Sequence, residues 1–256
     1  MNSSTFPKCL VYRNTRFEFN PQLIQYSAPK KTAHGGYCIQ ATYPINGTLS
    51  DGTSVQANAP IVLQTPVMQT SFGFSINDRD GSTKGGVDLT FNDDAPADVM
   101  AFKDVMDLWD RLLVTKAKSS KVEWFKSSKV SDDIIDYLYC KIVRENVRKS
   151  DGQKFADTLR PKIRRRSDQF VVDVFDIDGK PISIEEITPR SQIRALLSNS
   201  GIWLSDTLLV ASFECAQIQQ MASPELSGFA FVDDNAVKPG FTVNMSKEAN
   251  NLMDSE

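Results

Sequence analysis

The chain has 256 residues, a near balance of 29 basic and 32 acidic side chains, and a single histidine, His34. Most histidine-based catalysis and most zinc sites are not expected, because His34 lies in a glycine-rich loop that would not hold a catalytic base rigidly. No apolar run approaches the roughly 18 residues of a membrane-spanning helix, so we expect no membrane association through a transmembrane segment.

The first 58 residues predict a strand- and turn-rich N-terminal extension. They are rich in Ser, Thr, Asn, Pro and Gly, and short runs such as Tyr37–Tyr43 favour strands. Asn46-Gly47 and Asp51-Gly52 are strong turn signals between such runs.

Residues 59–222 predict the main domain, which opens with strands. The proline-punctuated run at 59–68 favours an edge strand. Phe72–Ile76 and Val87–Phe91 alternate with period two, which predicts a hairpin with a long connection over Asp78–Gly86. That connection lacks the Gly-Lys-Ser/Thr ending of a phosphate-binding loop, although Lys84 could contact a nucleic-acid backbone.

Two helices are predicted in the middle of the chain. Near 96–115, apolar residues recur at three- and four-residue steps, as in an amphipathic helix that begins at Asp94 or Pro96. Ser131 followed by two aspartates is typical of a helix N-terminus, and the pattern continues near 131–148.

The remaining pattern predicts more strands and then a loose tail. Strands are expected at 155–163, at 170–175 and 181–184 around an Asp178-Gly179 turn, and at 201–204 and 207–218. Arg190–Leu197 fits a helix or a strand. Residues 223–256 carry six acids and two lysines, which favours an acidic, loosely structured tail. The fold class is therefore mainly β with helical insertions, as in an OB-fold-like five-stranded β-barrel.

No metal or cofactor site is predicted. Val174–Glu185 resembles a calcium loop in part, but its first position lacks an oxygen ligand and a hairpin fits better. Asp104, Asp107 and Asp110 recur at three-residue steps and fit a solvated helix face better than paired catalytic carboxylates. The four cysteines show no metal-ligand spacing and are expected to be free or buried thiols.

The informative feature is a basic block at residues 111–166. It holds 16 Lys and Arg against seven Asp and Glu, a net charge of +9, so the rest of the chain sums to −12. Aromatic residues are interleaved with these cations. Such a mixture can neutralise a phosphate backbone and stack bases.

Within and near this block we expect the nucleic-acid contacts. Lys162, Arg164 and Arg166 would share one strand face and hold phosphates, and Lys121, Lys126 and Lys154 would line the approach. The aromatics expected to stack bases are Trp124, Phe125 and one of Phe72, Phe74 or Tyr139. For the cations of the strand, the alternatives are a solvated strand end or a clamp for acids of the same protein. For Trp124-Phe125, the alternative is a hydrophobic plug beneath a basic loop.

The order of several motifs resembles a known family. It runs from Val62–Met68 and Phe72–Ser75 through Trp109–Leu112 and Phe155–Ile163 to Phe170–Asp176. This order is similar to that of single-stranded DNA-binding proteins of the giant DNA viruses of eukaryotes, which are related to the phage T7 type. The chain departs from that pattern in carrying Phe213-Glu214-Cys215 where a tryptophan is expected.

The resemblance implies an OB-fold and a non-enzymatic protein that binds single-stranded DNA without sequence preference in viral replication, repair or recombination. It also implies an acidic tail that competes with DNA and recruits replication proteins, with candidates Asp233, Asp234, Glu248, Asp254 and Glu256. The implied location is intracellular, in the host nucleus, a cytoplasmic viral replication site or the virion, and a homo-oligomer is compatible with the sequence.

Two other hypotheses stay open at the level of sequence. A virion or assembly protein could use the basic block to dock an acidic partner. A nucleic-acid enzyme would need carboxylates such as Asp104 and Asp107, which the pattern favours less.

Overall fold

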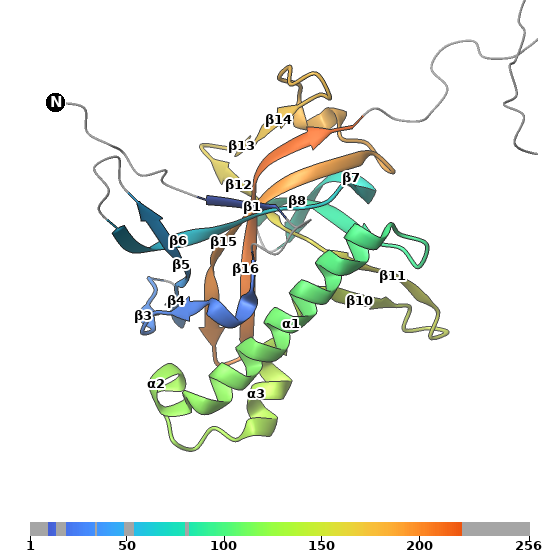
Figure 1. Ribbon diagram of the computed structural model, residues 1–256. Helices are drawn as coiled ribbons and strands as arrows, with labels where there is room; N and C mark the ends of the chain where they lie inside the picture. The colour runs from blue at the N-terminus through green and yellow to red at the C-terminus, as the bar shows by residue number, and fades with distance from the viewer. Residues whose placement is uncertain (1–9, 14–18, 34, 49–53, 80–81, 222–256) are drawn as a thin grey trace, which may run out of the picture. The chain divides into compact units, whose positions relative to one another are not determined.

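A computed structural model describes residues 10–13, 19–33, 35–48, 54–79 and 82–221 (Figure 1). By contacts the chain divides into Met1–Ser223 and Pro224–Glu256, and the second unit lies outside the described residues. The tail candidates Asp233, Asp234, Glu248, Asp254 and Glu256 therefore lie outside them too, as does His34.

The fold is mainly β, as predicted, and five strands close a barrel. The strands that pair in a ring are β7 (Met68–Arg79), β8 (Ser82–Phe91), β12 (Lys162–Arg166), β16 (Leu208–Gln220) and β15 (Gln192–Ser205). β8 pairs with β7, β7 with β15, β15 with β16, β16 with β12, and β12 returns to β8. This closed ring is consistent with an OB-fold-like barrel.

Shorter strands extend the barrel at its edges. In chain order they are β1 (Leu10–Arg13), β2 (Gln25–Tyr26), β3 (Lys30–Lys31), β4 (Tyr37–Ile39), β5 (Ala41–Thr48), β6 (Ser54–Gln64), β9 (Tyr139–Cys140), β10 (Arg144–Val147), β11 (Lys154–Leu159), β13 (Gln169–Val171) and β14 (Asp173–Phe175). Two 3-10 helices, η1 (Pro21–Leu23) and η2 (Ile184–Glu186), complete the set in the described ranges. β6 continues across residues 58 and 59, where the N-terminal extension was expected to end.

The long helix α1 (Ala97–Ser119) packs on the barrel and runs obliquely across its strands, with α2 (Lys121–Phe125) and α3 (Asp132–Leu138) at its C-terminal end (Figure 1). Its apolar stripe is buried, as the spacing predicts, through Val99, Phe102, Met106, Trp109 and Leu113. The Trp109 ring meets Phe213 of β16 edge to face at 5.3 Å between centroids. One hydrophobic core therefore joins the helix to the barrel.

Two predicted boundaries are wrong. The second helix ends at Leu138 rather than near residue 148, because β9 pairs with β16 and β10 pairs with β11 beyond it. The connection between the hairpin strands is also short, since β7 reaches Arg79 and β8 begins at Ser82. Strand pairing thus extends regular β-structure where local pattern indicated helix or loop, through the distant strand β16 in the first place and within the β7–β8 hairpin itself in the second.

The predicted turn at Asp178-Gly179 is present. Phe175 and Pro181 form a bridge across it, and the Gly179 N–H donates to the Asp176 carbonyl at 3.1 Å. The calcium-like run Val174–Glu185 is thus a strand, a turn and a short 3-10 helix.

Within the described ranges, no helix combines the length and the apolar character that a bilayer crossing requires. Cys38, Cys140 and Cys215, the cysteines in those ranges, are free thiols.

Candidate nucleic-acid interface

β11 and β12 line the same edge of β8 in one register. Leu159 faces Leu89 and Lys162 faces Gly86, so the intervening Arg160 falls opposite Asp88. Pro161 has no N–H to donate, which interrupts the ladder between the two strands. The sequence predicts one strand at 155–163, and the structure divides it at this proline.

A cleft of about 790 Å³ lies over the outer face of β8, between β7 and the β10–β11 hairpin. We call it the aromatic cleft because two of its residues are unusually exposed phenylalanines, Phe72 at 67% and Phe155 at 47%. Its other lining residues are Ser71, Ser75, Ile76, Asn77, Asp88, Asn146, Ala156, Thr158 and Arg160. The Arg148 guanidinium lies 5.0 Å above the Phe155 ring, so a cation adjoins this aromatic surface.

Phe72 is exposed because β7 bulges at this point. The register of β7 on β8 shifts between Thr70 and Phe74, and Gly73 has a φ of +65°. A Cβ at Gly73 would stand 2.3 Å from the Ile187 carbonyl oxygen, so only glycine fits here. The bulge directs the preceding Phe72 out of the sheet.

A second, smaller cleft of about 240 Å³ adjoins the first. We call it the basic cleft because it is lined by Lys141, Arg144, Arg160 and Lys162, together with residues of β9 and β16. Arg160 lines both clefts. The two clefts share this residue, and we call the surface formed by both the Arg160 groove.

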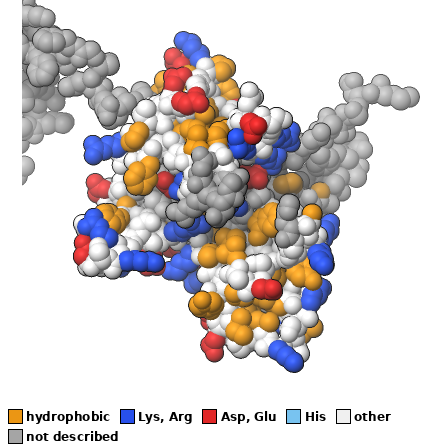
Figure 2. All heavy atoms as spheres, turned by 180° about the vertical axis from the view of Figure 1, so that it is seen from behind, with side chains coloured by type: hydrophobic (Ala, Val, Ile, Leu, Met, Phe, Trp, Pro, Cys, Tyr) orange, Lys and Arg blue, Asp and Glu red, His pale blue; other side chains and the backbone are white. Residues whose placement is uncertain are grey.

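The cations of the basic cleft affect one another. Burial lowers the pKa of Lys162, repulsion from Lys84 and Arg144 adds to the shift, and Glu214 opposes it. An anion bound here would relieve that repulsion. In Figure 2, Lys and Arg side chains gather towards the middle of this face of the molecule.

Arg160 is held in place by its neighbours. Its Nη2 donates to the Ser75 hydroxyl at 2.9 Å, and its Nε lies 3.7 Å from Oδ1 of Asp88. Burial raises the pKa of Asp88, whereas attraction from Arg160 and Arg144 opposes the rise.

The basic side chains of the predicted strand Lys162–Arg166 lie in different surroundings. Ile163 is buried and its neighbours are exposed, so Lys162 and Arg164 share a face as expected. Arg164 forms an ion pair with Glu214, with Nε 3.1 Å from Oε2, and Arg165 pairs with Asp168 at 3.0 Å. Arg166 is exposed at the strand end. Of this run, Lys162 lines the Arg160 groove.

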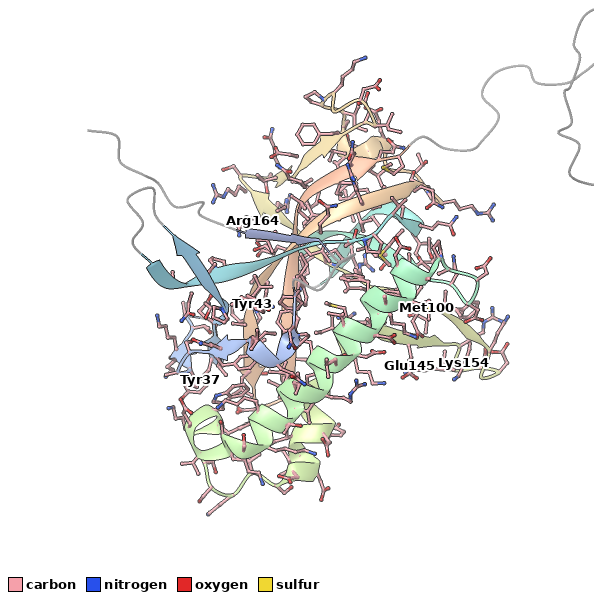
Figure 3. All side chains as sticks on the ribbon, in the orientation of Figure 1. Tyr37, Tyr43, Met100, Glu145, Lys154 and Arg164 are labelled. Atoms are coloured by element: carbon pink, nitrogen blue, oxygen red, sulfur yellow. The ribbon has the colours of Figure 1, made fainter. Side chains whose placement is uncertain are left out.

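The two basic stretches of the sequence do not meet. α2, which begins at Lys121, lies at the opposite end of the fold from β12 (Figure 1). Lys121 pairs with Asp132, Lys118 pairs with Asp136, and Lys126 is the exposed residue that ends α2 with a φ of 55°. Lys154, at the start of β11, lies well apart from Arg164 in Figure 3.

The expectation that Trp124 stacks bases is wrong. Trp124 lies in α2 rather than in a strand, is 1% exposed, and meets the Tyr26 ring edge to face at 5.6 Å. Phe125 is half-buried against the same core. These two residues therefore plug the helical end of the core, which is the alternative that the sequence left open.

Of the other aromatic residues predicted to stack bases, two are packed in the fold and one is exposed. Phe74 is half-buried and packs edge to face on Phe170 at 5.1 Å. The Tyr139 hydroxyl donates to the Asp110 carboxylate, and burial together with the Asp110 charge raises the pKa of this phenol. Phe72, by contrast, is well exposed within the aromatic cleft.

Asp110 is not part of a solvated face. It is 6% exposed and also accepts hydrogen bonds from the Ile142 N–H at 3.1 Å to each carboxylate oxygen. Burial raises the pKa of Asp110 to about 6, against the hydrogen bonds from Tyr139 and Ile142. Among the described residues no group of His, Cys, Asp or Glu is arranged to hold a metal ion.

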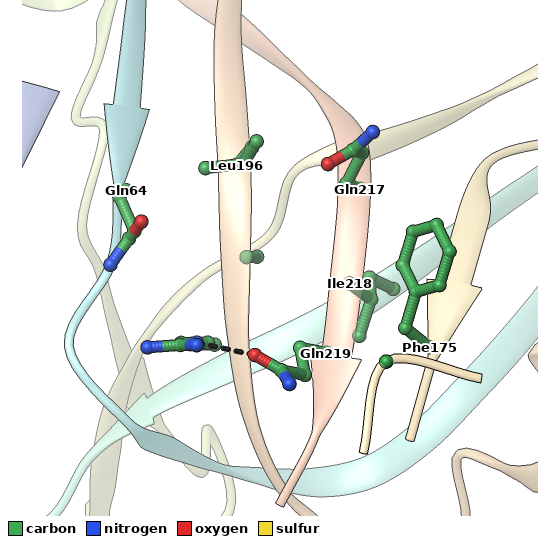
Figure 4. Close-up of a pocket in the computed structure, with 9 residues that line it drawn as sticks. Gln64, Phe175, Leu196, Gln217, Ile218 and Gln219 are labelled. Atoms are coloured by element: carbon green, nitrogen blue, oxygen red, sulfur yellow. Dashed lines mark hydrogen bonds between the residues drawn. The ribbon is translucent and has the colours of Figure 1, made fainter. Parts of the chain in front are cut away.

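A separate cleft of about 390 Å³ lies on β15, β16 and β14 (Figure 4). Arg194 donates to the Gln219 side chain across it at 2.7 Å. Its glutamine-rich lining shares no residue with the Arg160 groove.

Sequence reasoning did not single out several residues of the Arg160 groove, among them Arg144, Arg160 and Phe155. Arg144 was hidden because it was assigned to a helix end. Arg160 precedes a proline within a predicted strand. A proline there signals an interruption in the hydrogen-bond ladder of the strand, next to Arg160. Phe155 stands at the predicted start of the same strand.

A family model described as a family of unknown function (DUF5871) matches residues 87–233, which is more than half of the chain. The chain belongs to this family. The DUF5871 match includes Asp88, Arg144, Arg160 and Lys162 of the groove and begins after Phe72. No curated protein matches the sequence.

This chain is also similar in part to phage proteins of known structure. Gp2.5, a single-stranded DNA-binding protein encoded by bacteriophage T7, gives a TM-score of 0.41 at 15% identity over 72% of this chain and 100% of that one. The single-stranded DNA-binding protein of bacteriophage Enc34 gives 0.41 at 13% identity over 82% and 96%. The same Enc34 protein in complex with single-stranded DNA gives 0.38 at 12% identity over 78% and 98%.

Proposed function

We propose that the protein binds single-stranded DNA along the Arg160 groove. The observation that carries this proposal is that two clefts share Arg160 in their linings. One cleft has exposed phenylalanines, and the other has a cluster of cations. A single strand needs both kinds of surface in series, because its backbone is anionic and its unpaired bases are flat and apolar.

The roles follow from position. Arg144, Arg160 and Lys162 would neutralise phosphates in the basic cleft. Phe72 and Phe155 would stack bases in the aromatic cleft, where their exposure leaves ring surface free. Lys84, which lies close enough to Lys162 to influence its pKa, would extend the cationic surface.

The residues predicted from sequence are retained where the structure leaves them accessible. Lys154 and Arg166 are exposed and would add charge near the groove or along its approach, and Arg164 would do so on leaving Glu214. Lys121 and Lys126 would belong to a separate surface at the helical end.

We further infer a role in replication, repair or recombination of viral DNA inside the host cell, in keeping with the sequence resemblance to giant-virus proteins. The tail acids Asp233, Asp234, Glu248, Asp254 and Glu256 would compete with DNA and recruit replication proteins. These finer assignments rest on the resemblance.

Fluorescence anisotropy with a labelled oligothymidine tests the proposal. Binding should be tight at low salt, and log Kobs should fall with log salt at a slope of about −0.7 per phosphate neutralised. An unlabelled single strand should compete better than duplex DNA or polyglutamate. Absence of binding at low salt would overturn the proposal, and better competition by polyglutamate would favour an acidic protein partner.

A further inference from the structure

The aromatic cleft contains a carboxylate, which is unexpected in a surface for a polyanion. Asp88 lines this cleft, and its side chain is only 8% exposed. Within the described part of the chain its carboxylate accepts no hydrogen bond, because the Arg160 Nε stands 3.7 Å away and the Arg160 Nη2 donates to Ser75. Asp88 is therefore ion-paired with Arg160 but keeps free acceptor capacity on the cleft, so it is suited to accept hydrogen bonds from a ligand.

Asp110 is a structural carboxylate in the same fold and serves as a comparison for Asp88. It is equally buried, but it accepts hydrogen bonds from Tyr139 and Ile142. Asp88 therefore differs from it in having acceptor capacity left over and in lining a cleft.

The position of Asp88 between the strands that carry the phenylalanines points to a nucleobase as the group it would contact. β8 carries Asp88 and pairs on one side with β7, which holds Phe72, and on the other side with β11, which holds Phe155. For Asp88 to contact a base stacked on either exposed ring, the base would have to turn its edge towards the strand between them.

We propose that Asp88 reads the edge of a stacked base and gives the groove a preference for guanine over thymine at one position. Guanine offers two adjacent donors, N1–H and the N2 amino group, to the two oxygens of a carboxylate. Adenine and cytosine offer one amino group beside an acceptor. Thymine offers one N–H between two carbonyl oxygens, which a carboxylate repels.

This inference deepens the proposed function and rests on it. A good bidentate contact discriminates between bases by about 1–3 kcal/mol, so a single guanine should tighten binding by about fivefold or more. Binding in all other respects would stay independent of sequence, since phosphate contacts and stacking tolerate any base.

The test uses the full chain and two labelled 12-mers, one of thymidine only and one with a single central guanosine. Wild type should bind the guanosine strand at least about fivefold more tightly. Asp88→Asn should bind both strands alike, because an amide offers a donor as well as an acceptor. Asp178→Asn, in the exposed turn of the glutamine-rich cleft, removes the same charge elsewhere and should keep the preference.

A third strand tests the wild-type protein without a variant. Inosine in place of guanosine lacks the N2 amino group and should give an intermediate affinity. Equal affinity of wild type for all three strands, or a guanine preference that survives in Asp88→Asn, would overturn the inference and leave the proposed function standing. Failure to bind any of the strands at low salt would overturn the proposed function itself.

Discussion

The phenol of Tyr139 donates a hydrogen bond to the buried carboxylate of Asp110. Asp110 belongs to α1, whereas Tyr139 opens the segment that follows α3. The Ile142 N–H donates to the same carboxylate, so Asp110 fixes the path of residues 139–142 just before Arg144 enters the basic cleft. A buried acid in the helix thus helps position a cation of the Arg160 groove.

Asp110→Ala should destabilise the protein by about 3 kcal/mol, because it leaves a buried hydroxyl and a buried N–H without their acceptor. Tyr139→Phe removes only one bond and should cost about 1 kcal/mol. Urea denaturation measures both. Asp104→Ala, an exposed acid on the same helix, is the control, and a loss as large as that of Asp110→Ala would contradict the assignment.

Stability should depend on pH through Asp110. Its pKa of about 6 in the folded protein exceeds the value of about 3.9 expected in the unfolded chain. The folded state therefore binds this proton more tightly, and the resulting stability is complete below about pH 4 and is lost as the pH rises through about 6.

The free energy of unfolding of wild type relative to Asp110→Asn should accordingly fall by about 3 kcal/mol between about pH 4 and pH 7. Urea titrations at several pH values measure this difference, in which the titration of other carboxyl groups cancels. A difference that rises with pH would show that Asp110 is stabilised as the anion.

Arg160→Gln should weaken binding of oligothymidine and reduce the magnitude of the salt slope by about 0.7, the share of one phosphate. Anisotropy titrations between about 50 and about 200 mM salt give the slope. Arg194→Gln removes the same charge from the glutamine-rich cleft and should leave the slope unchanged. Equal effects of the two variants would mean that only net charge matters.

Phe72→Ala and Phe155→Ala should each weaken binding by about 1–3 kcal/mol if one base stacks on each ring. Neither change should lower the melting temperature much, since both rings are exposed. Tyr137→Ala, an 88% exposed aromatic on α3, is the control and should bind as wild type does. An equal loss of binding affinity in all three variants would mean that the bases do not stack on Phe72 and Phe155 in particular.

The sequence predicts those parts of the fold that depend on neighbours along the chain. The stripe from Val99 to Leu113 indicates α1, and period two in β7 and β8 indicates their hairpin. The end of α3 could not be predicted, because pairing of β9 and β10 with other strands determines it. Local pattern contains no information on such pairings.

The candidate site shows the same limit. A count of charges identifies residues 111–166 but cannot tell that α2 and β12, which carry its two basic stretches, lie apart in the fold. Trp124 and Phe72 look equally suited to stacking, yet one is 1% and the other 67% exposed. What separates them is a helix that packs on the core and a bulge at Gly73, and both depend on contacts with distant residues.

The closed ring of five strands limits how the protein can be shortened. The DUF5871 match begins at Val87, inside β8, whereas the strand that completes the ring on that side is β7. A fragment trimmed to residues 87–233 would lack β7 and half of β8, so the edge of β15 would be left unpaired and prone to aggregation. The region that the family model matches is therefore smaller than the closed barrel.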